Sequence, residues 1–101
     1  MTGMQKHIEL QVFGRVQMVM FRDFIKRAAR AWGVVGTVRN NPDGSVSVVA
    51  EGKEEALRKL VARAHRGSIL SRVDRVEEKW SDLPAENEGA LGEYKTFVIL
   101  Y

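Results

Sequence analysis

The segment from Gly14 to Arg22 holds the residues of this sequence best suited to chemistry, because it joins a predicted strand to the start of a predicted helix. Unpaired backbone N–H groups and the positive end of the helix dipole meet at such a junction, and both attract anions. Arg22 lies in the first helical turn, where its charge opposes the dipole unless an anion is bound. Its planar guanidinium suits a phosphate, whereas a simpler interpretation pairs it with Asp23 or Glu9.

Patterns of apolar residues predict the secondary structure that positions this loop. Alternation along the chain indicates strands, whereas apolar residues at steps of three and four indicate helices. Residues 41–44, Asn-Pro-Asp-Gly, are typical of a tight turn and predict a hairpin between the second and third strands. The predicted strands are 7–13, 34–40, 45–51, 72–80 and 94–101, the predicted helices are 22–32 and 53–66, and an exposed loop is expected at 81–93.

This order of elements predicts an α+β fold. It reads βαββαβ with an added final strand, and two right-handed βαβ crossovers would place both helices on one face of a single sheet. We therefore expect a ferredoxin-like sandwich whose mixed, mostly antiparallel sheet has four to five strands. The length of 101 residues suits one domain, residues 1–101.

Composition excludes several classes of function. The chain has no cysteine, which removes disulfides, thiolate nucleophiles and thiolate metal sites, and it has no cluster of His, Asp and Glu with ligand spacing, so we expect neither metal nor cofactor. No apolar run approaches the roughly 18 residues of a membrane span, and no secretory signal is visible, so we expect a soluble, cytoplasmic protein without membrane partners.

The sequence also argues against a nucleic-acid partner. The formal charge is only +3, from 16 Lys and Arg against 13 Asp and Glu, and residues 45–51 include no aromatic on which a base would stack. We expect a monomer that acts on a small molecule.

Two separated motifs of this chain resemble those of the acylphosphatase family. The first family motif reads glycine, any residue, valine, glutamine, glycine or histidine, valine, any residue, phenylalanine, arginine, and residues 14–22 match it except at Met18. In the second motif, a glycine, an aromatic, a small apolar residue, a variable one and an asparagine precede a turn with glycine and then valine. Residues 36–40, Gly44, Val46 and Gly52 match it, except at Thr37. The resemblance extends from His7 to Tyr101.

The resemblance implies hydrolysis of the carboxyl-phosphate bond of an acyl phosphate, with carboxylate and inorganic phosphate as products and no metal or covalent intermediate. Arg22 would hold the phosphoryl oxygens, and Asn40 would orient the attacking water. The backbone amides implied to assist Arg22 are those of Arg15, Val16, Gln17, Met18, Val19 and Met20. Without the resemblance Asn40 would be interpreted as a turn residue.

The departure at Met18 leaves an alternative open. If the family glycine has a positive φ, Met18 adds strain of about 1 kcal/mol to the loop, and its side chain is expected to face solvent or cap the pocket. Such strain would favour a phosphate- or acyl-phosphate-binding module with impaired turnover. Thr37 replaces an aromatic residue and is expected to affect packing more than chemistry.

Overall fold

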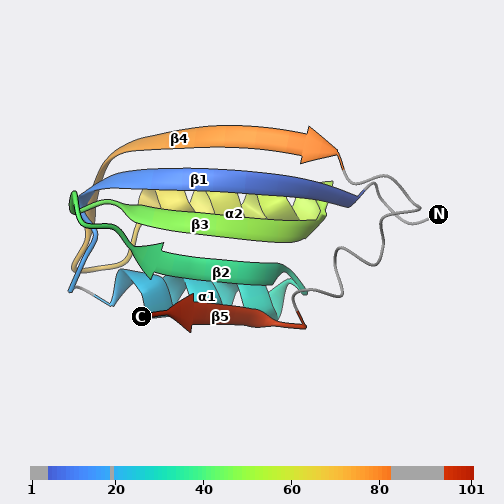
Figure 1. The fold of residues 1–101 in the computed structure, drawn as a ribbon, viewed down its shortest axis with the longest axis horizontal. Coiled ribbons are helices and arrows are strands. Elements are labelled where there is room, and N and C mark those ends of the chain that lie inside the picture. Colours follow the sequence, from blue (N-terminus) through green and yellow to red (C-terminus); the bar gives the residue numbers. More distant parts are fainter. Residues whose placement is uncertain (1–4, 19, 83–94) are drawn as a thin grey trace.

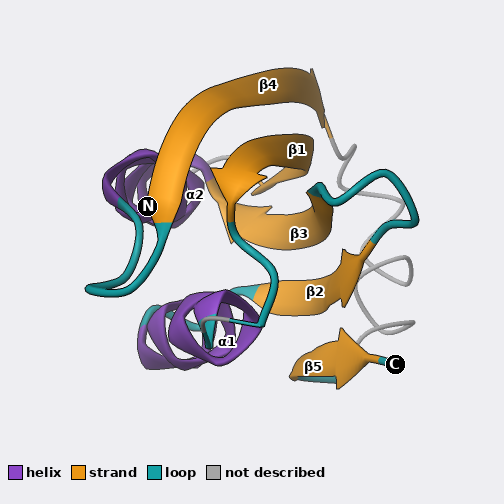
Figure 2. Cartoon of the chain, turned by 90° about the vertical axis from the view of Figure 1, so that its left-hand side faces the viewer, coloured by secondary structure: helices purple, strands orange, loops and turns teal. Residues whose placement is uncertain are grey.

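The computed structural model of the protein describes residues 5–18, 20–82 and 95–101. Five strands form one sheet in the order β4-β1-β3-β2-β5, in which only the β2–β5 pair is parallel (Figure 1). Both helices lie on the same face of this sheet (Figure 2). The elements are β1 (Gln5–Arg15), α1 (Phe21–Ala31), β2 (Val35–Asn40), β3 (Val46–Lys53), α2 (Glu54–Arg66), β4 (Arg72–Asp82) and β5 (Phe97–Leu100).

The predicted fold class is confirmed, with small differences at the ends of elements. Ser81 and Asp82, assigned to the exposed loop, continue β4, because they pair with β1 and Asp82 accepts a hydrogen bond from Lys6 at 2.7 Å. The last strand is shorter than the predicted 94–101. The rest of the predicted loop lies outside the described residues.

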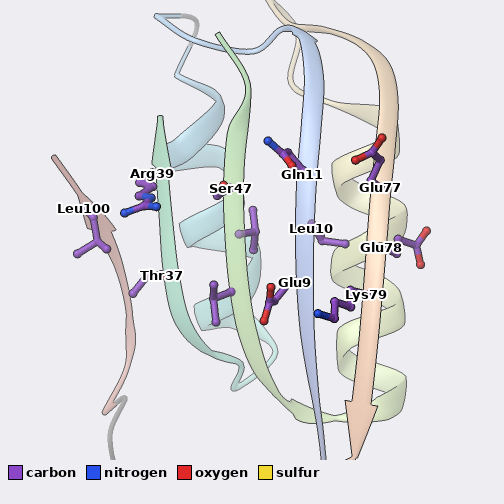
Figure 3. A pocket seen from close by; sticks show the side chains of 12 residues that line it. Glu9, Leu10, Gln11, Thr37, Arg39, Ser47, Glu77, Glu78, Lys79 and Leu100 are labelled. Atoms are coloured by element: carbon purple, nitrogen blue, oxygen red, sulfur yellow. The ribbon is translucent and has the colours of Figure 1, made fainter. Parts of the chain in front are cut away.

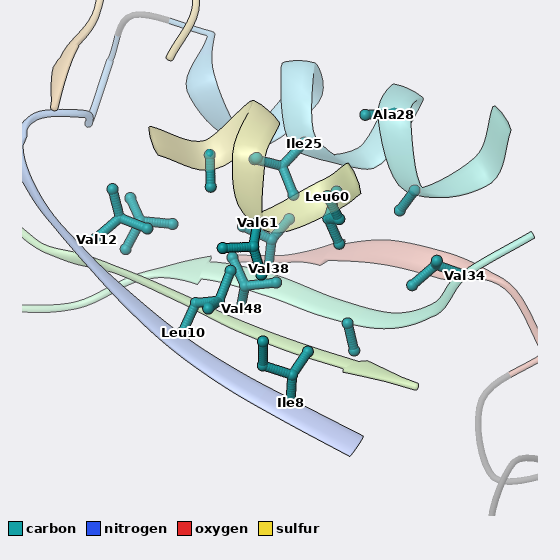
Figure 4. Close-up of a cluster of buried hydrophobic side chains, with 14 of the residues drawn as sticks. Ile8, Leu10, Val12, Ile25, Ala28, Val34, Val38, Val48, Leu60 and Val61 are labelled. Atoms are coloured by element: carbon teal, nitrogen blue, oxygen red, sulfur yellow. The ribbon is translucent and has the colours of Figure 1, made fainter. Parts of the chain in front are cut away.

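The core fills the space between the helices and the sheet (Figure 4). Alternate residues of β1 and β3 point toward the helices, and Ile25 and Leu60 meet them from α1 and α2 (Figure 4). Trp32 and Trp80 are half-buried at the edge of this core. No helix in the described ranges is long and apolar enough to span a membrane.

Gly14 and Gly36 lie where backbones approach too closely for a side chain. The β1–β4 pairing shifts register between Phe13 and Gly14, whose φ is +132°, and a Cβ at Gly14 would collide with the carbonyl of Arg72. This bulge ends the regular part of β1 just before residues 16–20, which join β1 to α1 and which we call the anion loop. Gly36 in β2 has a φ of +143°, and a Cβ there would collide with the carbonyl of Val49 in β3.

We predict that Gly36→Ala lowers the free energy of unfolding by about 3 kcal/mol, because the new methyl group must displace sheet backbone at a φ that alanine disfavours. Gly52→Ala is the matched control, since its φ is ordinary and its Cβ would lie 3.6 Å from a side-chain carbon of Val34. Urea unfolding followed by circular dichroism compares the two variants, and equal losses would contradict the steric argument.

Candidate active site

Two described residues of the loop between β1 and α1 have a backbone conformation that is typical of anion sites. Met18 and Met20 both have a left-handed conformation, with φ of 59° and 60°. Left-handed residues within a turn direct neighbouring N–H groups toward a common point, which forms a concavity that binds anions. As expected from the departure at position 18, the Met18 side chain faces solvent and is 96% exposed.

The N-terminus of α1 continues this concavity. Met20 is the N-cap residue, and no side chain caps the helix. Its carbonyl accepts the N–H of Phe24 at 3.0 Å, which is the first hydrogen bond of the helix. The first N–H groups of α1 and the positive end of its dipole are therefore at the end of the helix that joins the loop.

The predicted loop residues do not all lie in the loop. Arg15 is the last residue of β1 and pairs with Arg72 of β4. Val16, Gln17, Met18 and Met20 form the described part of the loop, and the fully buried Val16 anchors it in the core. Val19 lies outside the described residues.

Gln17 joins the loop to the hairpin between β2 and β3. Its side-chain Nε2 donates to the carbonyls of Asn41 at 2.8 Å and Ser45 at 2.9 Å. Sequence reasoning considered only the backbone amide of Gln17 and missed this side-chain role. No local pattern signals it, because both carbonyls already accept a backbone N–H within the turn, that of Asn41 from Gly44 and that of Ser45 from Asn41.

The hairpin turn is held by a compact set of polar contacts. The Asn41 amide donates to the hydroxyls of Ser45 at 2.9 Å and Ser47 at 2.7 Å. The N–H and hydroxyl of Ser45 both donate to the Asp43 carboxylate, and these hydrogen bonds lower the pKa of Asp43. Sequence reasoning also missed Ser45, which is buried in this network although it has a small polar side chain.

Arg22 is half-buried in the first turn of α1, with its guanidinium 5.1 Å from the centre of the Tyr101 ring. The alternative that pairs Arg22 with Asp23 or Glu9 is wrong. Asp23 instead pairs with Lys26 at 3.4 Å and with Arg27 at 2.8 Å, and Glu9 contacts His7. Throughout the described ranges Arg22 has no carboxylate partner.

Asn40, the last residue of β2, has a buried side-chain oxygen, Oδ1, with no hydrogen-bond partner in the described structure. Leaving a buried acceptor unpaired costs about 1–3 kcal/mol, so a ligand or water that donates to it would be stabilised there. Its neighbour Asn41 differs, because the Asn41 amide is used in the turn.

Two clefts meet at Arg22. One has a volume of about 490 Å³ and includes Asn40, and the other has a volume of about 470 Å³ and includes Met18 and Met20. Arg22 and Tyr101 line both clefts. The structure thus brings Asn40 and the two methionines of the anion loop into clefts that share one arginine.

A larger hollow of about 720 Å³ lies on the open face of the sheet (Figure 3). Side chains of Glu9, Arg39 and Lys79 are among its lining, but neither Arg22 nor Asn40 is. The described part of the chain also contains no group of three His, Asp or Glu residues arranged to hold a metal ion. Arg22 and Asn40, which the motifs single out, therefore line the two smaller clefts and not this hollow.

Comparisons with known proteins agree with this geometry. A family model described as Acylphosphatase matches residues 8–96. An acylphosphatase of Salinibacter ruber is 44% identical over 88 residues, 87% of this chain and 93% of the relative, and one of Thermococcus kodakarensis is 51% identical over 73 residues, 72% of this chain and 80% of the relative. The crystal structure of acylphosphatase from Bacillus subtilis superimposes with a TM-score of 0.83 at 34% identity, covering 95% of this chain and 99% of that one.

The left-handed conformation of Met18 yields a stability prediction. Met18→Gly should raise the free energy of unfolding by about 1 kcal/mol relative to Met18→Ala, because glycine adopts this φ without steric cost. Alanine is the matched control, since it also removes the exposed side chain but keeps the Cβ. Thermal and urea unfolding of both variants measure the difference, and an alanine variant as stable as the glycine variant would contradict strain at this position.

Proposed function

The chain belongs to the acylphosphatase family and hydrolyses the carboxyl-phosphate bond of acyl phosphates, and we propose that Arg22, the amides of residues 15–20 and Asn40 perform this reaction. The substrate is an acyl phosphate, and inorganic phosphate is one product. The observation that carries the proposed roles is the buried, unpartnered Oδ1 of Asn40 in the same cleft as Arg22.

Arg22 and the loop hold the phosphoryl group in this proposal. The guanidinium has no carboxylate partner in the described structure, so its fork of N–H groups is available to phosphoryl oxygens. The N–H groups near Met18, Met20 and the start of α1 add further donors. Such preorganised donors stabilise the charge that spreads over the equatorial oxygens in a loose transition state.

Asn40 orients the attacking water in this proposal. Its Oδ1 accepts a hydrogen bond from the water and fixes the direction of the oxygen lone pair toward phosphorus. Positioning alone contributes strongly to catalysis, because a carboxylate is a good leaving group and the loose transition state needs no strong nucleophile. We propose that the cation of Arg22 and the loop amides supply the positive charge, so that turnover needs no metal.

The comparisons do not support a binding module with impaired turnover, since the matched family and relatives are acylphosphatases. The geometry of the loop is consistent with turnover, because the Met18 side chain faces solvent and leaves the concavity open. Gln17 holds the loop against the hairpin despite the left-handed methionine.

Other properties remain proposals based on sequence. We propose that residues 1–101 act as one domain, as a monomer in the cytoplasm, and without a nucleic-acid partner. The absence of cysteine suits a reducing compartment, and the central strand β3 lacks the aromatic residues of an RNA-stacking platform.

The experiment that tests these roles is hydrolysis of an aryl acyl phosphate by the purified protein in the presence of a chelator. Wild type is compared with Arg22→Lys and Asn40→Ala. Inhibition by inorganic phosphate is measured in parallel, because it reports binding of the phosphoryl group separately from the rate.

Arg22→Lys is expected to lower kcat/KM by about 100-fold or more, because a point charge cannot replace two parallel N–H donors to one phosphoryl group. Arg27→Lys is the matched control, since Arg27 lies on the same helix and pairs with Asp23. Near-normal turnover of Arg22→Lys would refute the proposed role of the guanidinium fork.

Asn40→Ala is expected to lower kcat by about 100-fold while the inhibition constant of phosphate changes less than about threefold, since the amide contacts the water and not the phosphoryl group. The separation of rate from binding is the decisive readout. If phosphate inhibition weakens as much as the rate falls, Asn40 holds the phosphoryl group and the water-orienting role is wrong.

A further inference from the structure

We propose that the cleft lined by Met18, Met20 and Tyr101 binds the acyl group of the substrate and selects uncharged, apolar acyl groups. We call it the methionine cleft; its other lining residues are Val16, Phe21, Arg22, Asp23, Lys26 and Ile99. This inference rests on the proposed function, since it takes the phosphoryl group to lie at Arg22.

The direction of the reaction assigns the acyl group to this cleft. In phosphoryl transfer the attacking and leaving oxygens lie roughly in line on opposite sides of phosphorus. Asn40 lines one cleft only, whereas Arg22 and Tyr101 line both. With water at Asn40 and phosphorus at Arg22, the carboxylate leaving group points away from Asn40, and we assign it to the methionine cleft because Arg22 lines that cleft and Asn40 does not.

The surface of the methionine cleft is suited to apolar groups. Val16 and Phe21 are buried beneath it, whereas Met18 is 96%, Met20 68% and Tyr101 99% exposed. These exposed side chains have apolar area that the folded chain leaves uncovered, and covering it with a hydrocarbon group is favourable. Methionine is flexible and polarisable, so the cleft can adapt to acyl groups of different shape.

The charges at the methionine cleft disfavour an ionic acyl group. Apart from Arg22, its charged lining residues are Asp23 and Lys26, whose side chains lie 3.4 Å apart. Arg27 also contacts the Asp23 carboxylate, at 2.8 Å. Because both cations already contact the Asp23 carboxylate, an acyl group with its own charge would lose hydration without gaining an unpaired partner. An uncharged hydrocarbon group has no such cost.

The test compares acetyl, butyryl and hexanoyl phosphate, which share the same reacting bond and differ only in hydrocarbon length. In wild type, kcat/KM for hexanoyl phosphate should exceed that for acetyl phosphate on the order of tenfold, as partial burial of the added methylenes implies. Equal kcat/KM along the series would overturn the proposal without any variant.

Variants then assign the preference to the two methionines. In the double variant Met18→Gln and Met20→Gln, the hexanoyl-to-acetyl ratio of kcat/KM should fall by roughly tenfold, because glutamine has a similar length but a polar end. The double variant with leucine at both positions is the matched control and should keep the ratio within about twofold. A disturbed loop would lower both rates together and leave the ratio unchanged, and that result would overturn the proposal.

Arg22→Lys separates this inference from the function on which it rests. If Arg22→Lys loses turnover but the hexanoyl-to-acetyl ratio of kcat/KM is the same in wild type and in the double glutamine variant, only the acyl assignment fails. If Arg22→Lys keeps normal turnover, the proposed position of the phosphoryl group fails, and the acyl assignment fails with it.

Discussion

The proposed active site depends on the two hydrogen bonds from the Gln17 side chain to the hairpin between β2 and β3. The anion loop follows β1, whereas Asn40 ends β2, and β3 separates these two strands in the sheet. Within the described ranges, no strand pairing therefore connects the loop to Asn40 directly. Gln17 makes this connection with one rigid amide, and its two acceptors, the carbonyls of Asn41 and Ser45, belong to the same turn, so the loop and the turn are positioned as one unit.

The neighbouring residues Asn40 and Asn41 have different roles in this arrangement. Asn41 uses its amide on the hydroxyls of Ser45 and Ser47 and so maintains the turn that Gln17 contacts. Asn40 has no partner for its Oδ1 among the residues that the structure describes. Supporting the turn with Asn41 allows Asn40 to remain unsatisfied within the chain, and the cost of its buried acceptor is offset when a water or ligand donates to it.

Much of the fold and of the candidate site could be predicted from local sequence patterns, but contacts between distant segments could not. The alternation of β1 and the helical spacing of α1 are local, and so is the spacing of the motif that contains Arg22. The end of β4 depends on Lys6, far away in the sequence, and no pattern near Asp82 indicates that pairing. The ring of Tyr101 likewise reaches Arg22 only through the parallel pairing of β5 with β2.

Local sequence patterns also did not reveal the competition of three cationic residues for the Asp23 carboxylate or the backbone strain at Met20. The pair that we considered, Arg22 with Asp23, does not form because adjacent residues on a helix do not face each other. Lys26 and Arg27 lie three and four residues after Asp23, on the same side of the helix, and contact its carboxylate instead. The positive φ of Met20 has no sequence signal, since methionine disfavours it. In the proposed site this conformation serves both parts of the substrate, with the loop amides directed to the phosphoryl group and the thioethers of Met18 and Met20 to the acyl group. Glycine at these positions would relieve the strain, but it would remove the apolar surface that the two methionines add to the cleft beside Arg22.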